Sequence, residues 1–332
     1  MYTYLGFPRF QTHLQPPMNR TISFFGESLS VFKAALHTHS TVSEDGILSP
    51  DTLIGLYRAE GYDCLAFTDH RRTNNVSSYN GKGMTLISGV ELHPIRRVQG
   101  ELWHLLALGV PEDFPVRYTF PKQAAEAVHA AGSLLFMPHP YWTGFGSRLL
   151  ASIPHVLGIE VFNGAVREVG KAYNMESWDE MLMMGRDYTA LAVDDVHHDH
   201  DLFRGWTMIC SRDRSAAALL RALRRGDFYA SCGPEFRAIS CHDGVFEAEF
   251  TPCVAAQLCG PGRKGYRGHF DRTTRQAPAL ETVTHLKVDI SGLKPGHYVR
   301  CQLTDADGRM AWSCPIRRTG PGPDDFRRAG CR

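Results

Sequence analysis

The feature that most constrains this chain is a regular alternation of short apolar runs with segments of helical periodicity, from Phe32 to residue 230. The first helical segment has recognisable ends, because Ser49 suits the N-cap, Pro50 the first turn and Gly61 a left-handed stop. Strands that alternate with helices build a parallel sheet covered by helices, and about seven such units are enough to close a barrel. We therefore expect an α/β fold in which about seven units close a TIM-like parallel barrel.

The pattern changes near Tyr229, where short strands separated by turns replace the alternation of strands and helices. Such a segment is typical of a small all-β sandwich. The first residues of the chain have no sustained period, and the last are rich in Gly, Pro and Arg. We expect these segments in chain order: a surface extension over 1–31, the barrel over 32–230, the β-sandwich over 231–316 and a flexible tail over 317–332.

The composition argues against a protein built chiefly to grip nucleic acid through a broad basic face. Of 332 residues, 36 are Lys or Arg and 35 are Asp or Glu, so the formal net charge is only +1. A small phosphorylated substrate is compatible with this balance. The nine cysteines include no Cys-x-x-Cys pair, the first residues lack the pattern of a signal peptide, and no apolar run approaches the length of a membrane span. We expect a cytoplasmic protein without a membrane partner, and the sequence carries no signal for an oligomeric state.

Histidines and acidic residues gather where the expected strands end. In a parallel barrel the working residues lie at the carboxyl ends of the strands, where the loops meet. Alternate residues of a strand face the same side, so a His-x-His pair aims two imidazoles into one barrel mouth. The candidate metal ligands at these strand ends, or in the loop after the first strand, are His37, His39, Asp45, His70, Glu91, His104, His139, Asp195 and His197.

This set exceeds what one metal ion can use, so we expect two or three divalent ions. Sites rich in histidine with a few carboxylates and no cysteine suit zinc, iron or manganese, whereas magnesium and calcium prefer oxygen ligands. A single histidine at a strand end is more often a partly buried residue bonded to backbone, but the joint pattern is hard to obtain from core packing. The expected groups are His37, His39, Glu91 and Asp195 on one ion, His70, His104 and Glu91 on a second, and His139 with His197 near a third or near the leaving group.

The same residues carry a resemblance to the PHP (polymerase and histidinol phosphatase) superfamily of metal-dependent phosphoesterases, over residues 32–230. The matching motifs are His37-x-His39 with Asp45 and Gly46, Thr68-Asp69-His70, Gly89-Val90-Glu91, His104, His139-Pro140 and Asp195-Val196-His197. The β-sandwich segment resembles the extension of one bacterial branch, except that Cys314 stands where that branch usually has Asn. The resemblance implies a distorted (βα)7 barrel of the PHP type, with a trinuclear metal cleft that hydrolyses phosphate esters.

The residues taken alone agree with that chemistry. Clustered divalent ions lower the pKa of a bridging water, polarise phosphoryl oxygens and neutralise the charge that leaves. We therefore expect a phosphatase or phosphodiesterase that attacks a small monoester, or a nucleotide-type diester, with a metal-bridging hydroxide. Asp195, His197 and Glu91 are the expected catalytic residues. Adjacent strand residues face opposite sides, so Asp195 rather than Asp194 points into the cleft with His197.

Substrate contacts are expected from loops near the strand ends. The fork geometry of arginine suits phosphate oxygens, although solvated surface arginines are far commoner. The candidates are Arg148, Arg204, Asn163 and Tyr141, with Glu160 and Trp142 beside them. We leave out His93, His198 and His200, which flank the metal candidates.

Two other classes of function are compatible with the sequence. A metal-bound hydroxide attacks carbonyls as well, so the same site would suit a hydrolase of C–N or carboxyl ester bonds. Alternatively, the chain is a binding protein in which the β-sandwich recognises a sugar or a protein and the barrel only supports it. The complete set of ligands counts against this last hypothesis, and a screen of phosphate esters against esters and amides separates the first two.

Overall fold

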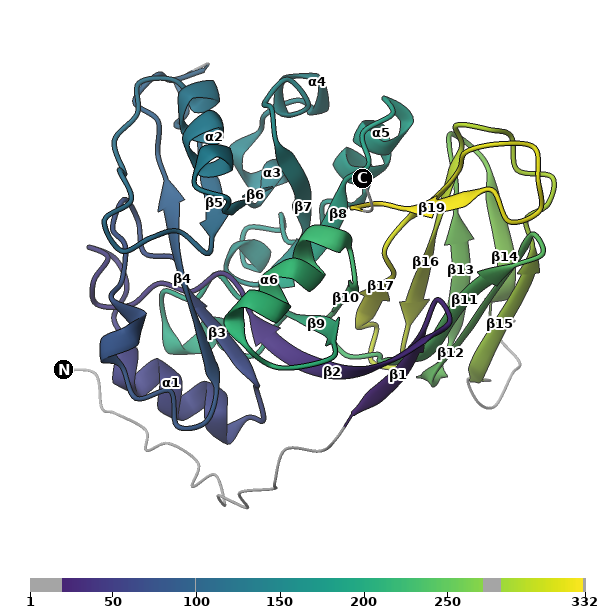
Figure 1. Cartoon of the computed structure of the whole chain (residues 1–332), viewed down its shortest axis with the longest axis horizontal. Coiled ribbons are helices and arrows are strands. Elements are labelled where there is room, and N and C mark those ends of the chain that lie inside the picture. Colours follow the sequence, from purple (N-terminus) through teal and green to yellow (C-terminus); the bar gives the residue numbers. More distant parts are fainter. Residues whose placement is uncertain (1–19, 99, 271–281, 331–332) are drawn as a thin grey trace.

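The computed structural model describes residues 20–98, 100–270 and 282–330. An α/β region and a region built mainly of strands lie side by side (Figure 1). The strands of the α/β region are β2 (Glu27–Ala35), β3 (Cys64–Phe67), β4 (Thr85–Leu92), β5 (Leu105–Leu108), β6 (Leu134–Met137), β7 (Val156–Asn163), β8 (Thr189–Val193) and β9 (Trp206–Ser211). Its helices are α1 (Pro50–Ala59), α2 (Pro121–Ala130), α3 (Pro140–Thr143), α4 (Ser147–Leu150), α5 (Met175–Met183) and α6 (Ala216–Arg225), with 3₁₀ turns η1 (Val76–Ser78), η2 (Ala165–Arg167) and η3 (Asp199–Asp201). No helix in the described part of the chain is both long and apolar enough to cross a membrane.

The strand pairings confirm a mixed α/β fold with a large sheet. β2, β3 and β4 pair in parallel, as do β6, β7 and β8, whereas β5 is antiparallel to β4 and β6. One edge of β2 pairs with β3 and the other with β9. The segments that follow β2 and β8 are joined to each other by a parallel bridge between Thr38 and Val196. The expected (βα)7 barrel is not confirmed, because β9 occupies the edge of β2 that β8 would need and carries the sheet onward.

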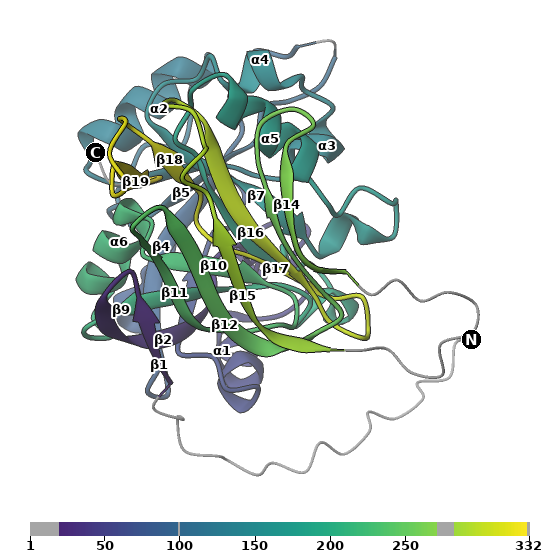
Figure 2. The ribbon, with the colours of Figure 1, turned by 90° about the vertical axis from the view of Figure 1, so that its right-hand side faces the viewer.

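The β region continues the same set of pairings. Its strands are β1 (Thr21–Phe24), β10 (Phe228–Ser231), β11 (Phe236–His242), β12 (Val245–Cys253), β13 (Ala255–Cys259), β14 (Gly265–Phe270), β15 (Val283–Asp289), β16 (Tyr298–Thr304), β17 (Met310–Trp312), β18 (Ile316–Arg318) and β19 (Phe326–Arg328). β10 pairs with β9 and β17, and β1 pairs with β2 and β11. The long strands β12, β15 and β16 face the viewer in Figure 2.

Both ends of the chain differ from the expectation in their described parts. The sequence predicts a surface extension over 1–31, of which 1–19 lie outside the described residues, whereas β1 and the start of β2 occupy the rest. The sequence predicts a flexible tail over 317–332, but β18 and β19 pair there. Ion pairs from Arg317 to Asp187 (2.7 Å) and from Arg328 to Asp227 (2.5 Å) hold this segment on the α/β region. Composition could not reveal these acidic partners, because they are distant in sequence.

An ion pair between a buried arginine and a partly exposed aspartate joins the two regions. Arg300 of β16 donates hydrogen bonds to both carboxylate oxygens of Asp179 in α5, at 2.8 and 2.6 Å. Its guanidinium lies 4.9 Å from the ring centroid of Trp178, and the hydroxyl of Tyr298 donates to Asp179 at 3.0 Å. Trp178, Tyr298 and Trp312 belong to one hydrophobic cluster. The β region therefore packs as part of the core of the α/β region.

We expect Asp179→Ala to lower the free energy of unfolding by about 3 to 5 kcal/mol, because it leaves the guanidinium of Arg300 buried without its carboxylate. Urea unfolding followed by circular dichroism measures this. The matched control is Asp307→Ala, which breaks an ion pair with Arg309 between side chains that are 72% and 55% exposed. That loss should stay below about 1 kcal/mol. Equal losses in the two variants would contradict the special weight given to the pair between Arg300 and Asp179.

Candidate metal centre

Two imidazoles form the innermost part of the candidate centre. His37 and His39 follow β2 and are fully buried. The Nδ1 of His37 lies 2.6 Å from Oε1 of Glu160, a contact that puts the proton on Nδ1 and leaves the lone pair of Nε2 free. That Nε2 is 3.2 Å from Oδ1 of Asp195, and Nε2 of His39 is 3.0 Å from the same oxygen. The two imidazoles of the His-x-His pair thus converge on one carboxylate.

The carboxylate of Glu91 stands at the centre of the cluster. Its Oε2 lies 2.8 Å from Nδ1 of His70 and 3.3 Å from Nε2 of His37. Its Oε1 lies 2.7 Å from Nδ1 of His104 and 3.2 Å from Nε2 of His139. Burial alone would raise the pKa of the Glu91 carboxyl, but the surrounding imidazoles, His104 foremost, hold it well below its ordinary value. Glu91 is therefore ionised, and its two oxygens face different histidines.

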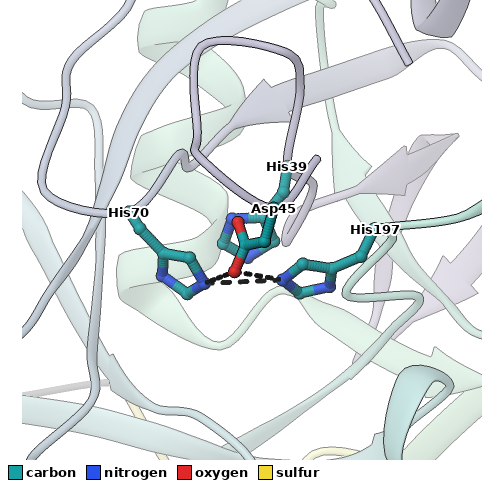
Figure 3. Close-up of side chains that lie close together, drawn as sticks. All are labelled: His39, Asp45, His70 and His197. Atoms are coloured by element: carbon teal, nitrogen blue, oxygen red, sulfur yellow. Dashed lines mark hydrogen bonds and ion pairs between the residues drawn. The ribbon is translucent and has the colours of Figure 1, made fainter. Parts of the chain in front are cut away.

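The carboxylate of Asp45 lies between the imidazoles of His70 and His197, close to His39 (Figure 3). The Oδ2 of Asp45 lies 3.1 Å from Nε2 of His70 and 3.6 Å from Nε2 of His197. The ring centroid of His39 is 4.2 Å from that of His70 and 4.2 Å from that of His197. Burial lowers the pKa of His39 to about 4, so its imidazole is neutral at pH 7. A neutral imidazole has the lone pair that metal binding requires.

The loop that carries Asp45 is shaped by Asp69 and by a glycine. The Oδ1 of Asp69 accepts hydrogen bonds from the backbone N–H groups of Ser40, at 2.7 Å, and Ser43, at 3.0 Å. The loop then folds so tightly that a Cβ at Gly46 would lie 2.2 Å from the carbonyl oxygen of Ser40. Only glycine fits this close approach, which brings Asp45 over the histidines.

The two aspartates that follow β8 point to opposite sides. The Oδ2 of Asp195 accepts a hydrogen bond from Nδ2 of Asn163 at 3.0 Å. Asp194 instead accepts from the hydroxyl of Tyr57, at 2.7 Å, and from the backbone N–H groups of residues 203, 204 and 205. Asp195 has φ 55°, a left-handed conformation that side-chain-bearing residues rarely adopt and that occurs at functional sites. Asp195 therefore faces the cluster, and Asp194 supports the next loop.

The donor set fits divalent cations. Several buried side-chain atoms have no hydrogen-bond partner among the described residues, for example Oε2 of Glu91 and Oδ1 of Asp195. Unpaired polar atoms in an interior are costly, and a cation would satisfy them. Overlapping groups whose ligand atoms lie within 4.8 Å of one another include His37, His39, Glu91 and Asp195; Glu91, His104 and His139; and His39, Asp45, His70 and His197. The groups share Glu91 and His39, as expected for ions held side by side.

These groups place some of the expected ligands differently. The first group has the same members as the first expected set. His70 lies in one group with His39, Asp45 and His197 and in another with Glu91 and His93, while His104 lies in a group with Glu91 and His139. The reason lies in the loops: the loop after β2 lies against the end of β3 through Asp69, a contact that strand order alone does not show.

A cavity of 350 Å³ opens over the cluster. Besides the cluster, its lining in the described part of the chain includes Arg71 and Trp142, and none of the four expected substrate contacts. Arg148, Arg204 and Tyr141 are exposed, and Nε of Arg204 donates to the carbonyl oxygen of residue 200 at 3.1 Å. Asn163 is buried beneath the cluster, where it hydrogen-bonds Glu160 and Asp195, so it positions ligands.

His93 and Arg71 line the cavity, although neither is among the site residues predicted from the sequence. The Nε2 of His93 lies 3.8 Å from Oε2 of Glu91, and its ring centroid is 4.1 Å from that of His104. A signal was present: His93 stands two residues after Glu91, the same spacing as in His-x-His. Arg71 directly follows Thr-Asp-His and has φ 52°, a left-handed backbone conformation that could not be predicted from the sequence.

No protein-family model matches the chain. A curated relative, the 5′-3′ exoribonuclease Rnm of Salmonella typhimurium, is 31% identical over 106 residues, which are 30% of this chain and 35% of that protein. The chain thus matches about a third of the length of this relative.

Among solved structures, the chain is similar to a two-domain protein of Bacteroides vulgatus that contains a predicted PHP-like metal-dependent phosphoesterase. The TM-score is 0.50 at 17% identity, over 90% of this chain and 94% of that one. The lesion-specific endonuclease EndoQ of Pyrococcus furiosus gives a TM-score of 0.42 at 15% identity, over 58% and 56% of the two chains, too low to carry an argument. The chain therefore has the fold of PHP-like metal-dependent phosphoesterases, and the resemblance drawn from the motifs is confirmed at that level.

We expect the purified protein to carry at least two transition-metal ions per chain, measured by mass spectrometry after metal-replete expression, because the buried oxygens and nitrogens otherwise stay unpaired. At a free ion concentration one hundred times the Kd, each bound ion raises the free energy of unfolding by about 2.7 kcal/mol, so removing the ions with a chelator should lower Tm. Glu91→Gln should lose much of this shift. Glu126→Gln, whose side chain is 62% exposed in an ion pair with His155, should keep it. At most one ion per wild-type chain would contradict the expectation.

Proposed function

We propose that the chain is a metal-dependent phosphoesterase that hydrolyses a small phosphate monoester or a nucleotide-type phosphodiester. The observation that carries the proposal is the convergence of buried, unpartnered carboxylate oxygens and imidazole nitrogens beneath an open cavity. Bound divalent ions would supply Lewis acidity and lower the pKa of a coordinated water. The diester alternative draws support from the partial similarity to a protein named as an exoribonuclease.

In this proposal the residues of the chain have separate roles. Glu91, Asp195 and His197 are the catalytic residues at the reacting phosphate, with Glu91 shared between ions. Asp195 is oriented by Asn163, and the Nδ1 of His197 is fixed by the carbonyl oxygen of Asp195 at 2.8 Å. Arg71 is the cation proposed to meet phosphate oxygens, because it is among the residues that line the cavity.

Finer features of the function belong to the proposal as well. The ions are zinc, manganese or iron and number two or three, since the donor groups overlap at Glu91 and His39. The strands β2 to β8 would form a distorted barrel that is closed by the bridge between Thr38 and Val196, because β9 holds the edge of β2 and keeps β8 from pairing with it. The compartment is the cytoplasm, a proposal that rests on cysteines without a paired motif.

A panel of substrates tests the reaction class. Metal-loaded enzyme is assayed on phosphate monoesters, nucleotide diesters, carboxyl esters and amides under one condition. The proposal requires turnover of a phosphate ester above that of the esters and amides. Activity confined to amides or carboxyl esters would overturn it and leave a metallohydrolase of carbonyl compounds. The same panel with Arg71→Ala separates the substrates, because losing a phosphate contact affects phosphate esters alone.

We expect Asp195→Asn to reduce turnover of a phosphate ester by roughly a hundredfold or more, because it removes a negative charge that helps to hold the cations. Asp194→Asn is the matched control, since the same change falls one residue away on the opposite face. It should lower stability, because Asp194 accepts the hydrogen bond of Tyr57 and those of the next loop, yet keep much of the activity per folded molecule. Near-normal turnover in Asp195→Asn with loss in folded Asp194→Asn would shift the site by one residue.

A further inference from the structure

We propose that His93 is a further metal ligand, which holds a divalent cation together with Glu91. The inference deepens the proposed function and rests on it for the presence of divalent ions at Glu91. Because the sequence contains His-x-His and Asp-x-His at two other strand ends, Glu91-x-His93 would be a third pair of the same kind. Its side chains come from the end of β4.

Strand geometry places His93 on the Glu91 side. β4 ends at Leu92, which is fully buried in the hydrophobic core, so the residues on either side of it face the opposite way. The side chain of His93 is 10% exposed and lines the cavity. His93 is therefore enclosed by the cluster rather than solvated above it.

The Nε2 of His93 faces Glu91 and is available to bind a cation. The Nε2 of His93 is buried without a hydrogen-bond partner in the described structure, and so is Oε2 of Glu91, 3.8 Å away. Two ligands of one zinc ion, each bound at 2.0 to 2.2 Å, lie at most about 4 Å apart. The gap is too long for a hydrogen bond and within the span of one ion.

The chemistry of His70 leaves this place open to His93. His70, Glu91 and His93 form a group with ligand atoms within 4.8 Å. However, Nε2 of His70 faces Asp45 at 3.1 Å, while its Nδ1 faces Oε2 of Glu91 at 2.8 Å. A neutral imidazole has one lone pair, so if Nε2 binds an ion beside Asp45, Nδ1 carries a proton toward Glu91. His93 is then the imidazole with a free lone pair on that side of Glu91.

The first test compares His93→Leu with His155→Leu in the full-length protein. His155 is half-buried and pairs with Glu126 at 2.9 Å, away from the cluster, so its loss controls for removing an imidazole. Zinc binding to chelator-stripped protein is measured by calorimetry and mass spectrometry. We expect the affinity of the weakest site to fall about tenfold or more in His93→Leu, and to stay within about twofold in His155→Leu. Wild-type stoichiometry and affinity in His93→Leu would overturn the proposal.

A second test uses the wild-type protein, so that a folding defect in His93→Leu cannot decide the outcome. Crystals grown with zinc are measured at the zinc absorption edge. An anomalous peak about 2.1 Å from Nε2 of His93 is expected. Occupied sites at the other groups, with no peak at bonding distance from His93, would overturn the proposal. Neither test involves a substrate, so absence of phosphate ester turnover would count against the proposed function alone.

Discussion

The buried carboxylate of Glu91 is the constraint on which the rest of the candidate centre depends. An ionised carboxylate that is cut off from water is stable only if positive charge or hydrogen bonds replace its hydration. Here the surroundings are imidazoles, which supply that charge only when they are protonated. Burial lowers the pKa of His104 to about 4, whereas at His37, His70 and His139 the nearby carboxylates outweigh burial and raise the pKa. Cations answer both needs at once, since they compensate the carboxylates and take the lone pairs of neutral imidazoles.

A further carboxylate, that of Glu160, positions several residues of the cluster through hydrogen bonds. One carboxylate oxygen of Glu160 accepts a hydrogen bond from Nδ1 of His37. The other oxygen accepts from the backbone N–H of His139 and from Nδ2 of Asn163, each at 2.8 Å. Asn163 in turn donates to Asp195. Because Glu160 is fully buried in β7, these contacts are held by the sheet itself. Residues that follow β2, β6 and β8 are thus aligned through one carboxylate of β7, which is the kind of support that fixes imidazole tautomer and orientation.

The parts of the site that could be predicted from sequence follow from a period of two. His37 with His39, and Asp195 with His197, share a face because alternate strand residues do. The same rule applies to Glu91 and His93, which is why His93 was within reach of the sequence. Which histidines share an ion was not, because it depends on the loop that Asp69 pulls toward β3.

The limits of the fold prediction have a similar cause. Helical and strand periods revealed the α/β alternation, but periodicity does not tell which strand lies beside which. The edge of β2 is taken by β9, and no local pattern in "GWTMIC" distinguishes an antiparallel neighbour from a further barrel strand. Likewise, the paired tail depends on arginines that meet Asp187 and Asp227 only after folding. Contacts between distant segments therefore set what local sequence left open.

Because β9 pairs with strands of both regions, the β region supports the candidate site. β9 pairs with β2 on one side and with β10 on the other, so the ladder that ends in His37 and His39 continues into the β region. Arg300 and Asp179 lock the two regions at a second place, between β16 and α5. A hinged arm would need an interface with few buried contacts, whereas this one shares strands, a hydrophobic cluster and an ion pair. The β region therefore acts as a fixed wall that braces β2, and through it the two innermost imidazoles.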